Sequence, residues 1–128
     1  MRTVVRIVLI AILVAGGCRT APVHNIPRTA ITAPATATMA DLSEAMWAAG
    51  RREGWRVREV ESGKILAEKT LRTHRALVEI DYDRQGFSMR LIEADNLLYD
   101  GHNIHKAYNL WAAALEKSIE DELRFRYP

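Results

Sequence analysis

The chain has 128 residues, which corresponds to a single domain at most. Hydrophobic residues make up 48% of it and charged residues 27%, which is typical of globular proteins and argues against a wholly disordered chain. The formal net charge is +2, but two of the basic residues are Arg2 and Arg6 and the remainder is balanced, so the basic patch of a nucleic-acid-binding protein is absent from the sequence.

The N-terminal segment has the three parts of a secretory signal. Arg2 and Arg6 precede an apolar run over residues 7–15, and two glycines follow. A membrane-spanning helix requires about 20 apolar residues, and this run is much shorter. The sequence therefore predicts a signal peptide over residues 1–17.

The only cysteine of the chain, Cys18, follows this segment directly. Ala15, Gly16, Gly17 and Cys18 resemble the lipobox of bacterial lipoproteins, although that family most often has leucine where Ala15 stands. The resemblance implies a diacylglyceryl group on the Cys18 sulfur, cleavage before Cys18 and an acylated amino group. Two or three acyl chains anchor a protein stably without a spanning helix. An ordinary signal peptide or an uncleaved anchor with an incidental cysteine is the alternative.

The residue after Cys18 bears on which of the two membranes such a lipoprotein would occupy. In the lipoproteins that this segment resembles, aspartate at that place favours retention at the inner membrane, and here it is Arg19. The resemblance therefore implies a lipid-anchored outer-membrane protein whose domain lies in the periplasm.

Residues 19–38 contain three of the four prolines and many alanines and threonines, with no apolar period. Such a composition favours extended backbone over helix. We expect residues 18–38 to be a lipidated cysteine with an extended tether in which His24 is solvated. We expect residues 39–128 to form a single periplasmic domain.

A helix is predicted from Met39, with Thr38 or Asp41 as its cap and Gly50 and Gly54 at its end. Four strands follow at 55–61, 64–71, 75–83 and 87–94, separated by short turns. A long amphipathic helix closes the chain, with an apolar stripe formed by Ile104, Tyr108, Trp111, Leu115, Ile119 and Leu123. The pattern predicts a two-layer α+β sandwich, a four-stranded antiparallel meander with the N-terminal and C-terminal helices on one face.

Motifs for catalysis, phosphate binding or structural zinc are absent from the sequence. The carboxylates of Glu79, Asp81 and Asp83 alternate along one strand. They can form cross-strand charge pairs with Arg56, Arg58 and Arg90 on a solvated face, which we favour over a carboxylate-pair active site. We therefore predict no catalytic residues and no cofactor.

The densest polar stretch spans residues 95–109, between the last strand and the last helix. His105 and Asn109 lie four residues apart there, and Asn103 or Asp100 can cap the helix. We favour a polar latch that satisfies open backbone groups. A ligand or partner surface, or a metal site on His102 and His105 completed by Asp95 or His74, remains an alternative. The candidate surface residues are Asn96, Tyr99, His102, Asn103, His105 and Asn109.

Three function classes follow. The first is a non-catalytic envelope lipoprotein whose domain contacts another envelope protein or the cell wall. Its layout is loosely similar to the helix-grip modules of accessory lipoproteins in outer-membrane assembly, and fold does not imply function. The second is a periplasmic small-ligand or metal-binding module centred on residues 95–109. The third, a hydrolase, lacks a nucleophile–base pair in the sequence.

Overall fold

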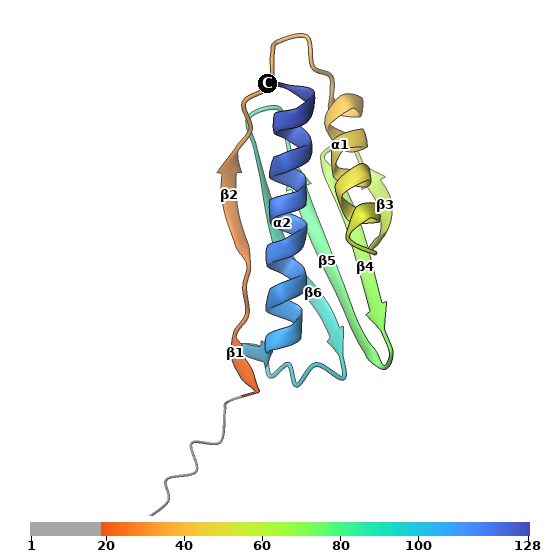
Figure 1. Ribbon diagram of the computed structural model, residues 1–128, viewed down its shortest axis with the longest axis vertical. Coiled ribbons are helices and arrows are strands. Elements are labelled where there is room, and N and C mark those ends of the chain that lie inside the picture. The colour runs from red at the N-terminus through yellow and green to blue at the C-terminus, as the bar shows by residue number, and fades with distance from the viewer. Residues whose placement is uncertain (1–18) are drawn as a thin grey trace, which may run out of the picture.

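The computed structural model describes residues 19–128 (Figure 1). The predicted signal peptide and Cys18 lie outside the described residues. The described chain contains two helices, α1 (Met39–Arg52) and α2 (Lys106–Arg126). Its strands are β1 (Thr20–Pro22), β2 (Ile26–Ala30), β3 (Arg56–Glu61), β4 (Lys64–Leu71), β5 (His74–Tyr82), β6 (Gly86–Asp95) and β7 (Asn103–His105).

The main sheet is antiparallel and has the strand order β2-β6-β5-β4-β3. Strands β3 to β6 are neighbours in chain order and form the predicted meander. Both helices lie on the same side of this sheet (Figure 1). The predicted α+β class is confirmed, but the sheet has five strands rather than four.

The fifth strand comes from the segment that was expected to be a free tether. β1 pairs with β7, β2 pairs with β6, and Ile26 of β2 is only 2% exposed. β1 and β2 are three and five residues long, too short for an apolar period to show in the sequence. The two prolines of these strands are tolerated because each strand lies at the edge of its sheet. The tether prediction is therefore wrong for this segment, and the folded region begins well before Met39.

α1 begins at a capping box, as its sequence suggests. The Thr38 hydroxyl accepts a hydrogen bond from the Asp41 backbone N–H, and the Asp41 carboxylate accepts one from the Thr38 N–H. The helix continues through Gly50, which was expected to end it. A Cβ at Gly50 would collide with the side chain of Val57, so glycine allows the helix to pack closely on β3.

The core lies between the helices and one face of the sheet. The alternation predicted for β5 is confirmed, because Ala76, Val78, Ile80 and Tyr82 are all buried. The apolar stripe of α2 is also found, except that Trp111 is only partly buried. Lys69 Nζ lies 5.3 Å from the centre of the Trp111 ring. Within residues 19–128, none of the helices is long and apolar enough to cross a membrane.

Candidate functional site

The polar stretch singled out in the sequence lies at one end of the molecule. The loop 96–102 leaves β6 and leads through β7 into α2, and β1 lies beside β7 (Figure 1). The turn between β4 and β5 lies at the same end (Figure 1). We refer to residues 19–22, 71–74 and 96–106 together as the β1 end.

His105 is the N-cap of α2. Its Nδ1 accepts a hydrogen bond from the Ala107 backbone N–H at 3.0 Å, and its own backbone N–H donates to the Leu97 carbonyl oxygen at 2.7 Å. The predictions of Asn103 or Asp100 as the cap are therefore wrong. An imidazole nitrogen that accepts from a helical N–H does the work of a capping oxygen.

Asp100 instead closes the turn before β7. Its Oδ1 accepts hydrogen bonds from the backbone N–H groups of His102 and Asn103, at 2.8 and 2.7 Å. These bonds favour the ionised carboxylate, and they hold the pKa of Asp100 below its usual value. His102 itself is exposed, and its contribution to this turn is made by its backbone.

Asn109 connects α2 to the N-terminal segment. Its Nδ2 donates to the Pro22 carbonyl oxygen at 3.0 Å, and its Oδ1 accepts from the His24 backbone N–H at 2.9 Å. The side chain of His24, expected to be solvated, is 42% exposed. Two long-range bonds from one side chain therefore fix the first described residues against the last helix.

Asn96 connects the loop to the β4–β5 turn. Its side-chain Nδ2 donates a hydrogen bond to the Thr73 hydroxyl at 2.5 Å. Its backbone carbonyl oxygen accepts one from His74 Nδ1, also at 2.5 Å. Since a carbonyl only accepts, His74 Nδ1 carries the proton in this contact. Together with His105 and Asn109, these bonds provide the contacts expected of a polar latch.

The residues proposed for a metal site are engaged elsewhere. His74 and His105 lie close, with ring centres 5.7 Å apart, but His105 Nδ1 caps the helix. Asp95 accepts a hydrogen bond from Arg75 at 2.9 Å. In the part of the chain that the structure describes, there is no group of three or more His, Cys, Asp or Glu side chains placed to hold a metal ion.

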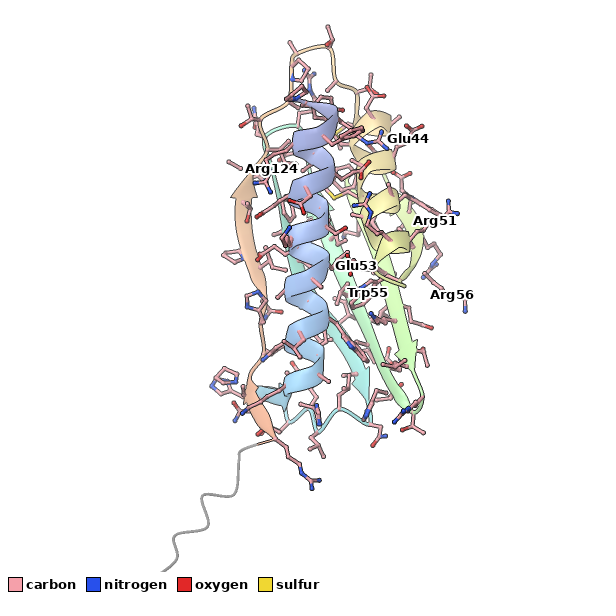
Figure 2. The ribbon with its side chains drawn as sticks, in the orientation of Figure 1. Glu44, Arg51, Glu53, Trp55, Arg56 and Arg124 are labelled. Atoms are coloured by element: carbon pink, nitrogen blue, oxygen red, sulfur yellow. The ribbon has the colours of Figure 1, made fainter. Side chains whose placement is uncertain are left out.

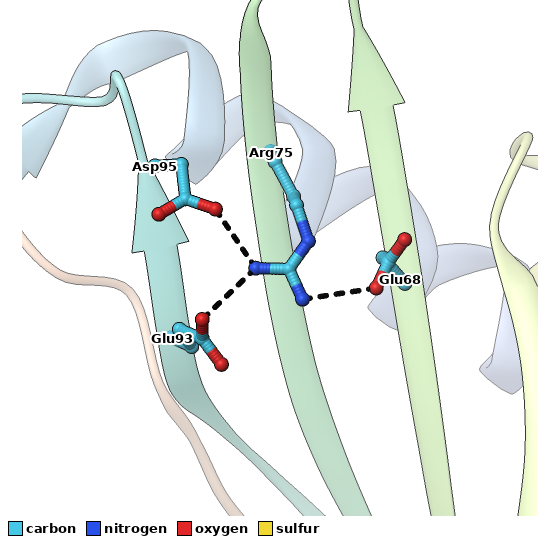
Figure 3. Close-up of polar contacts among 4 residues, drawn as sticks. All are labelled: Glu68, Arg75, Glu93 and Asp95. Carbon is cyan, nitrogen blue, oxygen red and sulfur yellow. Dashed lines mark hydrogen bonds and ion pairs between the residues drawn. The ribbon is translucent and has the colours of Figure 1, made fainter.

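Arg75 is the centre of a charge cluster on the outer face of the sheet (Figure 3). Its guanidinium contacts Asp95 at 2.9 Å, Glu68 at 3.0 Å and Glu93 at 3.2 Å. These carboxylates raise the pKa of Arg75 above its usual value. The sequence does not reveal this cluster, because the partners of Arg75 are set by strand register. A bulge at Ile92 brings Glu93 and Asp95 of β6 alongside it.

Two of the three carboxylates predicted to alternate here form ion pairs, Glu79 in β5 and Asp83 just after it. Glu79 lies 2.7 Å from Arg90, and Asp83 lies 2.6 Å from Arg28, a partner that the sequence analysis did not predict. Burial, and then the charge of Glu79, raise the pKa of Asp81 above its usual value. The Glu79–Arg90 contact confirms the cross-strand pairing expected for Arg90. The pairing expected for Arg56 and Arg58 is wrong, because neither forms an ion pair within residues 19–128, and Glu79 is buried rather than on a solvated face.

A second surface feature was not predicted. Trp47 lines two shallow hollows of about 570 and 580 Å³. The first is lined by residues of β3, β4 and β5, and the second mainly by residues of α1. Arg51 of α1 and Arg56 of β3 project outward on this side of the molecule (Figure 2). β3 is an edge strand, so its outer backbone groups are unpaired within residues 19–128. The signal in the sequence was Trp47, a large apolar residue outside the buried stripe of its helix.

No protein-family model, curated protein or solved structure matches this chain.

Proposed function

We propose that this protein is a lipid-anchored lipoprotein of the bacterial outer membrane, with a non-catalytic domain in the periplasm. The support in the sequence is the short apolar run after Arg2 and Arg6, followed by the lipobox-like residues that end at Cys18. Acylation of Cys18 would supply the two or three chains that stable anchoring requires.

The observation that carries the proposal furthest is the short connection between the anchor and the fold. The carbonyl oxygen of Arg19 accepts a hydrogen bond from the Lys106 backbone N–H at 3.0 Å, and Thr20 is the first residue of β1. Cleavage before Cys18 would thus leave one residue between the membrane anchor and an ordered strand.

The domain would act by contact with another envelope protein or with the cell wall. The hollows beside Trp47 favour a protein partner, because they combine a partly exposed indole, charged flanks and the open edge of β3. An added strand on such an edge gains main-chain hydrogen bonds, and side chains provide specificity.

A small-ligand or metal-binding module remains the second candidate. The observation in its favour is the closeness of the His74 and His105 rings. It is weaker than the first because the polar groups there already bond to one another.

Metabolic labelling with a palmitate analogue tests the anchor. We expect the full-length protein to be labelled and to sediment with membranes, and we expect Cys18→Ala to lose both properties. Label that survives in Cys18→Ala would exclude acylation at this residue.

Site-specific photocrosslinking in intact envelopes tests the contact surface. A photoreactive amino acid at Trp47 should give a discrete adduct, whereas the same group at Ile92 should not. The two side chains are matched controls because they are 37% and 40% exposed. Equal adducts from both positions would refute a partner site beside Trp47.

A further inference from the structure

The β1 end exposes large apolar side chains. Leu71, at the end of β4, is 53% exposed, and Leu98 and Tyr99 in the loop are 57% and 38% exposed. The bonds from Asn96 to Thr73 and His74 hold the turn and the loop together, so these three side chains belong to one end of the molecule. Loop tips in water more often carry small polar residues.

The backbone of this end holds its exposed residues in a strained conformation. Leu98 has a φ of 54°, Asn96 of 51° and Arg72 of 55°, all in the left-handed region. Asparagine adopts this region readily, but leucine does so at a cost. The loop therefore turns Leu98 outward against its backbone preference, while the adjacent Leu97 is buried. Strain that exposes an apolar side chain points to a surface contact.

Three exposed basic residues at this end lack an ion-pair partner among residues 19–128, and the adjoining carboxylates of Glu68, Glu93 and Asp95 are paired with Arg75. These basic residues are Arg19, Arg72 and Lys106. Asp100 is the acidic residue of the loop, and it bonds to the backbone of its own turn. Apolar and aromatic side chains beside free cations are the composition that suits the interface of an anionic bilayer.

The proposed lipid attachment site adjoins this end in the sequence. Arg19 is bonded to Lys106 at the start of α2, and Cys18 directly precedes Arg19 in the sequence. A lipid on Cys18 would therefore leave no spacer to hold the β1 end away from the bilayer. The C-terminal end of α2 lies at the opposite end of the molecule (Figure 1), about 30 Å along the helix axis.

We propose that the β1 end is a membrane-contact surface, in which Leu71, Leu98 and Tyr99 enter the interface of the bilayer that carries the Cys18 lipids, while Arg19, Arg72 and Lys106 face anionic headgroups. This inference rests on the proposed lipoprotein function. It fixes the orientation of the domain, with α2 directed away from the membrane and the loop 96–102 against it. Phe125, 83% exposed near the far end of α2, then faces the aqueous space.

The test uses the full-length protein, purified after processing in cells and reconstituted into vesicles of phosphatidylcholine and phosphatidylglycerol. An environment-sensitive fluorophore is attached at Leu98→Cys, or at Phe125→Cys as the matched control. Because Cys18 is the only native cysteine and its sulfur would be acylated, the label reacts with the introduced thiol. Nitroxide-bearing lipids then quench a fluorophore that lies in the bilayer interface.

We expect a blue shift and strong quenching at position 98 and neither at position 125. Vesicles of phosphatidylcholine alone should reduce the quenching at position 98, because the headgroup contacts are lost. An unquenched label at position 98, or equal quenching at both positions, would overturn the orientation. Vesicle flotation and the mass of the Cys18 peptide test the anchor separately. A chain that floats with an acylated Cys18 but shows no quenching refutes this inference alone, whereas an unmodified Cys18 refutes the proposed function and this inference together.

Discussion

The backbone N–H of Lys106 donates a hydrogen bond to the carbonyl oxygen of Arg19 across 3.0 Å. Lys106 is the first residue of α2, where N–H groups lack partners within the helix. One of these open donors is therefore satisfied by the residue that follows the proposed lipid attachment site. Arg19 and the start of α2 are coupled in this way, so that the N-terminal segment of the described residues is part of the fold.

Replacing Ile26 by alanine tests whether this segment stabilises the domain. Ile26 is 2% exposed in β2 and packs in the core, so Ile26→Ala should lower the free energy of unfolding by about 2–5 kcal/mol. Thr32→Ala, at an exposed position beyond β2, is the control and should have little effect. Chemical denaturation measures both. If both substitutions change the free energy of unfolding equally little, the segment behaves as a free tether and does not stabilise the domain.

Two tyrosines give opposite predictions for the loss of a hydroxyl. Tyr108 is fully buried, and its hydroxyl has no hydrogen-bond partner among residues 19–128, so burial raises its pKa. Tyr108→Phe should therefore raise the free energy of unfolding by about 1 kcal/mol, since an unsatisfied buried donor is removed. The Tyr82 hydroxyl donates a hydrogen bond to Glu59 at 2.9 Å, so Tyr82→Phe should lower the free energy of unfolding by about 1 kcal/mol. Thermal unfolding measures both variants. A loss of stability in Tyr108→Phe as well as in Tyr82→Phe would indicate a hydrogen-bond partner for the Tyr108 hydroxyl.

Most of the fold could be predicted from periodicity. The alternation of Ala76, Val78, Ile80 and Tyr82 and the stripe of α2 follow directly from the burial of one face, and the structure has both. β2 could not be predicted, because five residues with a proline contain too little pattern. What decides its place is the open edge of β6, a tertiary feature that local propensity does not encode.

The candidate site was predicted as a location but not as a set of contacts. The sequence indicated that residues 95–109 were dense in polar groups, and the structure shows their hydrogen bonds. The sequence alone could not identify His105 as the N-cap of α2, because asparagine and aspartate are better capping residues in general. The Arg75 cluster depends on the register between β5 and β6, which is set by a bulge. Long-range pairing of this kind leaves no local signal.

The capping role of His105 separates the latch from a metal site. His105→Ala should lower the free energy of unfolding by about 1 kcal/mol, because the Ala107 N–H loses its partner. His105→Asn should restore most of the loss, since the amide oxygen can cap. Zinc or a chelator should leave the melting temperature of the wild type unchanged. A zinc-dependent rise that disappears in the His105 variants would favour the metal-binding alternative.

Glu122 of α2 makes the stability of the domain depend on pH. Its Oε2 accepts a hydrogen bond from Arg52 of α1 at 2.5 Å, and its Oε1 accepts one from Arg126 at 3.0 Å. The hydrogen bond from Arg52 is the main cause that holds the pKa of Glu122 below its usual value, against the opposing effect of burial. A carboxylate whose pKa is lower in the folded state stabilises the fold above its unfolded pKa, and that contribution disappears as the pH falls through the folded value.

Glu122→Gln should therefore lower the free energy of unfolding near pH 7 by about 1 kcal/mol, a modest figure because the Arg52 side chain is half exposed. The difference from the wild type should shrink as the pH falls below about 4, where the wild-type carboxyl also becomes neutral. Glu120→Gln is the control on the same helix, because Glu120 makes no ion pair within the described residues. Urea titrations at pH 7 and pH 3 measure the difference directly. A Glu122→Gln difference of equal size at both pH values would show that the residue acts by packing, because only the charged form can be lost on protonation.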